Sequence, residues 1–268
     1  MAQQGCIEHC TDCFDSAAKE YVMWDTFPVP WFGNVESKQI RFATVGLNPS
    51  WTEFVTPEKQ WRDSKERLPA LMEMGVKSRD KISGEQAKQI ASARENYFTT
   101  TERKPHPWFK NMQGVMSGAK LKCAYADGTA VHLDVVACAT WQEWGKLSNA
   151  AKTVLVSKCF PKFTDTLSKL ATGVWLLLDG RTVSETVIAR CKAVVNFQEK
   201  VGDNPSLEVW RGKLSAEFGC REFLGWSNPI NRQTNQHSLV AWLRRRARRA
   251  AKRLTLAARD GAMGAPSR

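Results

Sequence analysis

Three segments of the chain place amide and carboxylate side chains beside turn-forming residues. They are Gly46-Leu47-Asn48-Pro49-Ser50, the stretch from His132 and Asp134 to Thr140-Trp141, and the stretch from Gly225 to Gln233, which contains Asn228. Taken singly, each has a structural explanation, because Asn-Pro forms turns, an aspartate caps local structure, and polar loops cover surfaces. Each also follows an apolar run, and ligands bind beyond the carboxyl ends of strands in open α/β sheets. The three segments are therefore candidate parts of one polar site.

The elements that must position these segments alternate along the chain. β-Branched and aromatic runs predict strands at 40–47, 131–139, 173–180, 193–197, 207–210 and 221–226. Charged stretches with intermittent apolar positions predict helices at 57–75, 84–98, 108–119, 162–170, 181–190 and 237–258. The alternation is typical of an α/β fold, so we expect a single domain with a mostly parallel central sheet flanked by helices on both faces.

The domain organisation follows from composition shifts at the two ends of the chain. We expect an irregular N-terminal segment at 1–27, an α/β domain at 28–243, and a basic C-terminal helix and tail at 244–268. The chain shows no internal repeat and no flexible linker, which favours one domain.

Composition narrows the class of protein. Among 268 residues, 43% are hydrophobic and 25% are charged, which is typical of a globular protein. No apolar run reaches the roughly 18 residues that a membrane span needs, and the first residues do not resemble a secretory signal. We therefore expect a monomeric cytoplasmic protein whose eight cysteines are reduced thiols.

The positive charge is concentrated at the C-terminus. The net charge is +12, and residues 237–268 contain nine basic residues and one acidic residue. Such a block suits a polyanion, because each neutralised phosphate releases counterions, whereas the alternative is a solvated helix face without a partner. We predict a nucleic-acid partner, with the DNA backbone held by Arg244, Arg245, Arg246, Arg248, Arg249, Lys252 and Arg253.

The first segment carries a resemblance to a known family. Val45-Gly46-Leu47-Asn48-Pro49-Ser50, with aromatic residues close behind, resembles the first motif of the uracil-DNA glycosylase superfamily, which reads Gly-(apolar)-Asn-Pro-Gly in two of its branches. Asn228-Pro229-Ile230-Asn231-Arg232 is similar to the second motif, and the strand that ends at Asp179-Gly180 resembles the strand between them. Val29-Pro30-Trp31-Phe32-Gly33 and the stretch from His132 to Gly145 look like an uncharacterised bacterial branch, so the resemblance covers roughly 28–243.

The resemblance implies the three-layer fold of that superfamily and hydrolysis of an N-glycosidic bond in DNA. Such a reaction passes through an oxocarbenium-like sugar while negative charge builds on the departing base. By motif position, Asn48 orients the water that attacks the sugar. An amide steers this water but does not take its proton at neutral pH, so the mechanism relies on stabilising the leaving base.

The resemblance also implies a pocket for an extruded base. Gly46, Leu47, Pro49 and Ser50 form its first wall, and Trp51 or Phe54 supplies the ring on which the base stacks. Asp134 stands where the family has a base-reading residue, often an Asn that serves uracil. A carboxylate accepts hydrogen bonds and matches the exocyclic amine of a cytosine-type base. The target is therefore uracil or a modified cytosine such as those in some phage genomes, and a structural role for Asp134 remains the alternative.

The second motif departs from the family because its usual His is absent. Asn228, Asn231, Arg232 and Gln233 are the available donors, and His237, four residues beyond them, is a candidate to replace the missing His. We expect His106, between two prolines, to belong to loop structure, and His132, inside a strand, to be either a core residue or a residue that supports a site side chain.

The N-terminal cysteines form a separate cluster. Cys6, Cys10 and Cys13, with His9 among them, have spacings compatible with an iron–sulfur cluster that recruits a distant fourth cysteine, or with a zinc site. Three unligated thiols are the alternative. The expected reaction requires no cofactor, and nucleotide-binding glycine motifs are absent from the sequence.

Together these features predict a monofunctional DNA glycosylase that serves genome maintenance or attacks phage DNA. The alternative from another class is a non-catalytic nucleic-acid-binding protein that retains the fold. An RNA-acting or metal-dependent enzyme has only the N-terminal cysteines in its favour.

Overall fold

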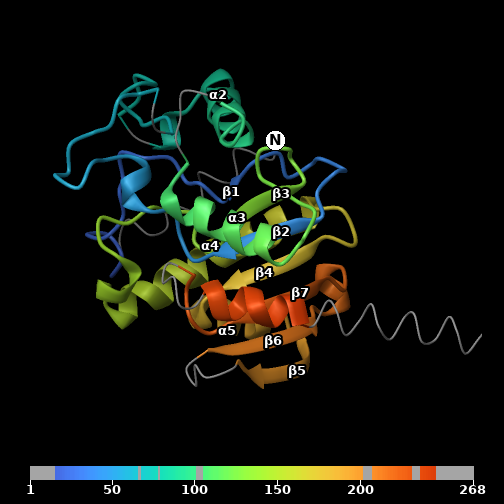
Figure 1. Cartoon of the computed structure of the whole chain (residues 1–268). Coiled ribbons are helices and arrows are strands. Elements are labelled where there is room, and N and C mark those ends of the chain that lie inside the picture. The colour runs from blue at the N-terminus through green and yellow to red at the C-terminus, as the bar shows by residue number, and fades with distance from the viewer. Residues whose placement is uncertain are drawn as a thin grey trace, which may run out of the picture.

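A seven-stranded sheet forms the centre of the molecule. The computed structural model describes residues 16–65, 68–77, 79–100, 105–201, 207–230 and 236–245. The strands lie in the order β1-β3-β2-β4-β7-β6-β5, from β1 beneath α2 in Figure 1 to β5 at the opposite end. Their bounds are Trp31–Phe32 for β1, Phe42–Gly46 for β2, Ala130–Asp134 for β3, Trp175–Asp179 for β4, Val194–Lys200 for β5, Glu208–Lys213 for β6 and Glu222–Trp226 for β7.

The sheet is mixed rather than mostly parallel. The neighbouring strands β3, β2, β4 and β7 are parallel, whereas β1, β6 and β5 join by antiparallel pairing. This corrects the expectation of a mostly parallel sheet, while the α/β class is confirmed. The reason is local: β5, β6 and β7 follow one another without an intervening α-helix, and short connections join strands in antiparallel fashion.

Helices cover both faces of the sheet. They are α2 (Gly84–Glu95), α3 (Pro107–Gly118), α4 (Asn149–Lys169), α5 (Arg181–Arg190) and a further helical stretch at 236–245. Alternate residues of β4 show the two faces: Leu176 and Leu178 pack in the core cluster that contains α4 and α5 residues, whereas Leu177 packs in the cluster that contains α3 and residues of 236–245. Successive strand residues point to opposite faces, so each strand contributes to both cores.

Two helix predictions differ from the structure. Residues 57–75, expected to be helical, form turns in their described part, and Val55 pairs with Trp61 in an isolated bridge. Pro69 lies inside this stretch and removes a backbone donor that a helix there would need. Conversely, α4 begins well before the predicted 162–170, because Pro161 lies inside the helix and tertiary packing overrides its local cost.

The described part of the N-terminal segment belongs to the core. Ala18, Val22 and Met23 are at most 1% exposed, and the backbone N–H of Met23 donates to Ala139. Residues 16–27 therefore pack against the strands of the domain. No helix in the described residues is long and apolar enough to cross a membrane.

Candidate active site

One cavity lies at the carboxyl ends of the four parallel strands. It has a volume of about 530 Å³, and residues from the ends of β2, β3 and β4 and from the loop after β7 line it. The start of α3 and the first turn of α5 complete its walls. Its lining comprises Phe32, Gly46, Leu47, Asn48, Pro49, Ser50, Glu53, His106, Trp108, Phe109, His132, Asp134, Trp144, Gly145, Asp179, Gly180, Arg181, Thr182, Val183, Ser227 and Pro229.

Gly46 makes room for two polar side chains of β3. It pairs with Asp134 in the parallel register of β2 and β3. A Cβ atom at position 46 would lie 2.9 Å from Oδ1 of Asp134 and 2.9 Å from Cε1 of His132. Since real Cβ atoms do not approach other heavy atoms so closely, a larger residue at position 46 would displace this pair.

Asp134 presents an unpaired acceptor. Its side chain is 2% exposed, and its Oδ1 lies 3.3 Å from Nε2 of His132. Its other oxygen, Oδ2, is buried and has no hydrogen-bond partner among the described residues. Burial raises the pKa of Asp134, and the neighbouring His132 opposes this effect. An unsatisfied buried carboxyl oxygen is costly, so Asp134 is a candidate for a functional role at the cavity that it lines.

A chain of hydrogen-bonding side chains extends from Asp134 through His132 into the core. His132 Nδ1 lies 2.9 Å from the Thr44 hydroxyl, which in turn lies 2.7 Å from the Tyr125 hydroxyl. The His132 ring is 4% exposed and packs edge-on against Phe109. The prediction that His132 is a core residue is confirmed, and its position shows that it also orients Asp134.

Asn48 is oriented by its amide nitrogen. Nδ2 donates to the Pro49 carbonyl at 3.1 Å and to the Thr140 hydroxyl at 3.2 Å. Oδ1 has no hydrogen bond within the described ranges, and the residue lines the cavity. The side chain therefore offers an acceptor that can fix one hydrogen of a bound water molecule.

Asp179 joins three parts of the site. Its Oδ1 accepts hydrogen bonds from Trp226 Nε1 at 2.7 Å and from the Ile230 backbone N–H at 3.1 Å. Its Oδ2 accepts from Trp108 Nε1 at 2.7 Å. Burial raises the pKa of Asp179, and the hydrogen bonds from Trp108 and Trp226 oppose this effect. The residue thereby ties the end of β4 to α3 and to the loop after β7.

His106 caps the helix that enters the cavity. Its Nδ1 accepts from the Trp108 backbone N–H at 3.2 Å, and its own backbone N–H donates to the Tyr97 hydroxyl at 3.2 Å. The Tyr97 hydroxyl donates to Glu53, whose buried carboxylate also lines the cavity. Burial lowers the pKa of His106, and the positive charge of Arg62 lowers it further.

The structure brings most of the first predicted wall together with Asp134. Gly46, Leu47, Asn48, Pro49 and Ser50 all line the cavity. Pro229 of the second motif lines the same cavity, and Asn228 lies between two lining residues. The segments around positions 48 and 228 therefore converge, as their placement after strands predicts.

The predicted stacking residues lie elsewhere. Phe54 is 0% exposed in the core cluster that contains α3 residues, so a base could reach its ring only if the core unpacked. Trp51 does not line the cavity, and Lys59 Nζ lies 3.6 Å from the centre of its ring. These placements correct the stacking prediction. The phenylalanine and tryptophan rings at the cavity are those of Phe32, Phe109, Trp108 and Trp144. The two tryptophans are half-buried, whereas the two phenylalanines are buried.

His237 also lies away from the cavity. It is exposed on the helix at 236–245 and lines a separate hollow of about 350 Å³ beside α3, together with Gly118 and Arg244. The expectation that His237 replaces the missing His of the second motif is therefore corrected. Arg244 donates to the Gly118 carbonyl, and Arg245 is exposed on the same helix.

Some predicted residues lie outside the described residues. These are Asn231, Arg232 and Gln233 of the second motif, the cations Arg246, Arg248, Arg249, Lys252 and Arg253, and the cysteines Cys6, Cys10 and Cys13. Among the residues that the structure does describe, no group of three or more His, Cys, Asp or Glu side chains is arranged to hold a metal ion.

Several polar and aromatic residues of the site were not singled out from the sequence. Among them are Glu53, His106, Trp108 and Asp179, which all line the cavity. Only Asp179 lies in a segment that carries the family resemblance, at the end of a predicted strand. His106 and Trp108 come from α3, whose proximity to the strand ends depends on packing across the sheet. The proline on each side of His106 was the available signal, because Pro at the first position of a helix points to a cap just before it.

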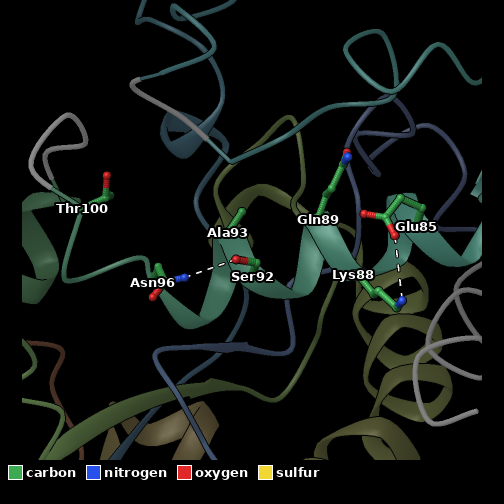
Figure 2. Close-up of a pocket in the computed structure, with 7 residues that line it drawn as sticks. All are labelled: Glu85, Lys88, Gln89, Ser92, Ala93, Asn96 and Thr100. Atoms are coloured by element: carbon green, nitrogen blue, oxygen red, sulfur yellow. Dashed lines mark hydrogen bonds and ion pairs between the residues drawn. The ribbon is translucent and has the colours of Figure 1, made fainter.

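Another hollow lies on α2, far along the sequence from these motifs. It is lined by Glu85, Lys88, Gln89, Ser92, Ala93, Asn96 and Thr100 (Figure 2). Lys88 pairs with Glu85 and Asn96 donates to Ser92, so these side chains are engaged along the helix surface (Figure 2). It shares no lining residue with the cavity at the strand ends.

In comparison with known proteins, no family model matches the chain, and no curated protein matches it.

Proposed function

We propose that the chain is a monofunctional DNA glycosylase. It hydrolyses the N-glycosidic bond of an extruded non-canonical pyrimidine, either uracil or a modified cytosine, and leaves an abasic site. The observation that carries the proposal is the convergence of Asn48, Asp134 and Pro229 on one cavity at the ends of parallel strands. The resemblance of residues 46–50 to the first motif of the uracil-DNA glycosylase superfamily, with its three-layer fold, supports it.

Asn48 orients the attacking water. Its Oδ1 accepts a hydrogen from the water while Nδ2 remains bound to Pro49 and Thr140. The water oxygen forms a bond to the anomeric carbon of the sugar, and the carbon–nitrogen bond to the base breaks. The bonding electron pair leaves with the base, and the proton lost by water finally neutralises that base. Charge on the sugar and the base is greatest in the transition state, where fixed dipoles stabilise it.

Asp134 and the ring of Trp108 hold the base. Trp108 has accessible ring surface in the cavity, and Asp179 fixes the ring through the indole N–H. Asp134 offers a single acceptor, Oδ2, because Oδ1 already faces His132. The exocyclic amino group of a cytosine-type base or the ring N–H of uracil satisfies this acceptor. The base thus supplies the hydrogen bond that Asp134 lacks in the free protein.

The basic C-terminus binds the DNA backbone in this proposal. Arg244 and Arg245 begin the cationic block on the helix beside α3, and the remaining cations follow them in sequence. Binding to backbone phosphates positions the duplex or single strand without reading its sequence. The protein acts as a monomer on intracellular DNA, either in genome maintenance or against phage DNA.

A substrate screen tests the proposal. Oligonucleotides that carry uracil, hydroxymethylcytosine or glucosylated hydroxymethylcytosine are incubated with the protein and then treated with alkali, which cleaves abasic sites. We expect strand cleavage on at least one of them. Asn48→Ala should lower turnover about 100-fold, because the water loses its orienting acceptor, while DNA affinity stays unchanged.

The matched control is Asn96→Ala, which removes an amide from the surface of α2 (Figure 2). This variant should keep full activity. Turnover that survives Asn48→Ala contradicts the assigned role of Asn48. Retained DNA binding without cleavage of any substrate favours the non-catalytic nucleic-acid-binding alternative.

A further inference from the structure

The ring of His106 has one nitrogen committed to the fold and one free. Nδ1 accepts from the Trp108 backbone N–H, so it carries no proton in the neutral ring. The proton of the neutral imidazole is therefore on Nε2. This nitrogen has no hydrogen bond within the described part of the chain, and the ring lines the cavity. Nε2–H is thus a donor available to a bound ligand.

The position of this donor is fixed from three sides. The Tyr97 hydroxyl accepts the backbone N–H of His106 at 3.2 Å, and the same hydroxyl is held by Glu53. Two residues after His106, the indole of Trp108 donates to Asp179 at 2.7 Å. The start of α3 is therefore tied to the segment that follows β2 and to the end of β4. A donor held in this way needs little reorganisation when charge develops beside it.

The surroundings keep the imidazole neutral. Burial lowers the pKa of His106, and the nearby Arg62 acts in the same direction. A neutral imidazole donates one hydrogen bond without taking up a proton, and it stays in this form near neutral pH.

We propose that His106 donates a hydrogen bond from Nε2 to the departing base and stabilises the negative charge that develops on it. The inference rests on the proposed glycosylase function and identifies the donor that the second motif lacks. The electron pair of the broken carbon–nitrogen bond moves onto the base, and the hydrogen bond from His106 strengthens as that charge grows. His106 makes this contact from the start of α3, whereas His237 is exposed beside another hollow.

Two substitutions separate the role of His106 as a hydrogen-bond donor to the base from its role as a helix cap. His106→Asn keeps a side-chain oxygen that can accept the Trp108 N–H, as asparagine does at helix caps, but it does not reach the position of Nε2. His106→Gln extends further, so its amide N–H approximates that position while the cap is lost. If His106 acts on the base, H106N lowers kcat about 100-fold and H106Q retains more activity than H106N.

The experiment compares leaving groups. Wild type, H106N and H106Q are assayed in single turnover on oligonucleotides that carry uracil or 5-fluorouracil, and on the matching pair of 5-hydroxymethylcytosine and 5-formylcytosine. Fluorine and the formyl group withdraw electrons and make the base a better leaving group, so the loss in H106N should be smaller for the second base of each pair. Thermal unfolding shows whether each variant is folded.

The outcomes distinguish this inference from the proposed function. A loss in H106N that is larger for the poorer leaving group of a pair than for the better one supports the inference. An equal loss on both bases, or full activity in H106N with a defect confined to H106Q, overturns it and leaves His106 as a cap. If the wild type releases no base from any substrate, including those of the screen above, the proposed function fails and the inference fails with it.

Discussion

Two buried aspartates at the same edge of the sheet are used in opposite ways. Asp179, at the end of β4, accepts three N–H groups, and both of its oxygens are engaged. Asp134, at the end of β3, has one oxygen beside His132 and one without a partner among the described residues. Burial raises the pKa of both carboxyls. Asp179 therefore connects parts of the structure with both of its oxygens, whereas Asp134 keeps one oxygen without a partner, which in the proposed function binds the base.

The largest expected effect concerns Asp179. Asp179→Ala leaves the buried indole N–H groups of Trp108 and Trp226 and the N–H of Ile230 without their acceptor, so we expect a loss of about 3–5 kcal/mol in the free energy of unfolding. Urea unfolding measures this loss. Asp134→Ala is the matched control at the end of β3, which is separated from β4 by β2, and its cost should be clearly smaller. Equal costs for the two substitutions would contradict this distinction between the two aspartates.

A second substitution tests the space that Asp134 and His132 occupy. Gly46→Ala places a Cβ 2.9 Å from Asp134 Oδ1, so β2 or the pair on β3 must shift. We expect a cost of about 1–3 kcal/mol in the free energy of unfolding. Gly114→Ala on α3 is the control, because its Cβ would meet no atom within 4 Å and alanine stabilises a helix by up to about 1 kcal/mol. A Gly46→Ala variant as stable as wild type would show that the pair is loosely held.

The smallest expected effect is the contribution of Asp134 to the pH dependence of the free energy of unfolding. Since its pKa is raised in the folded state, its contribution to stability is present below the ordinary aspartate pKa and is lost as pH rises through the folded value. Asp134→Asn removes this loss, so the variant should gain stability relative to wild type as pH rises from about 4 to 7. Urea unfolding over this range measures the difference.

Asp127 should show the opposite pH dependence of stability and serves as a comparison. A hydrogen bond from Thr129 lowers the pKa of this exposed carboxyl, so its small contribution is present above the ordinary aspartate pKa and is lost on acidification. Asp127→Asn should therefore lose stability relative to wild type as pH rises. If the difference in free energy of unfolding between Asp134→Asn and wild type does not change with pH, then Asp134 has the same pKa in the folded and unfolded chains, which contradicts the prediction.

Local patterns predicted the elements that support the site. The strand around Leu177 and the helix 181–190 were read correctly because a continuous apolar run followed by a polar turn is a local signal. The stretch 57–75 was read wrongly, because intermittent apolar residues there serve turns that pack on the domain. The antiparallel part of the sheet was also missed, since strand direction depends on how distant strands pair.

Only part of the site could be predicted from the sequence, because local patterns do not show which side chains reach the cavity. Asn48 directly follows the predicted strand 40–47, so its place at a strand end could be inferred from sequence. Asp134 lies inside the predicted strand 131–139, and only the structure ends β3 at this residue. Phe54 lies only six positions beyond Asn48, yet the chain turns after Ser50 and buries its ring in the core. Sequence proximity to a motif therefore did not determine exposure to the cavity.

The sequence by itself determined which polar side chains end the strands and that the C-terminus is cationic, because side-chain alternation and charge are properties of short segments. Only the tertiary structure decided that α3 places His106 and Trp108 over the ends of β2 and β4, and that Asp179 holds them there. These contacts join residues that are far apart along the chain. Their formation depends on strand order and on packing across both faces of the sheet, which no local pattern encodes.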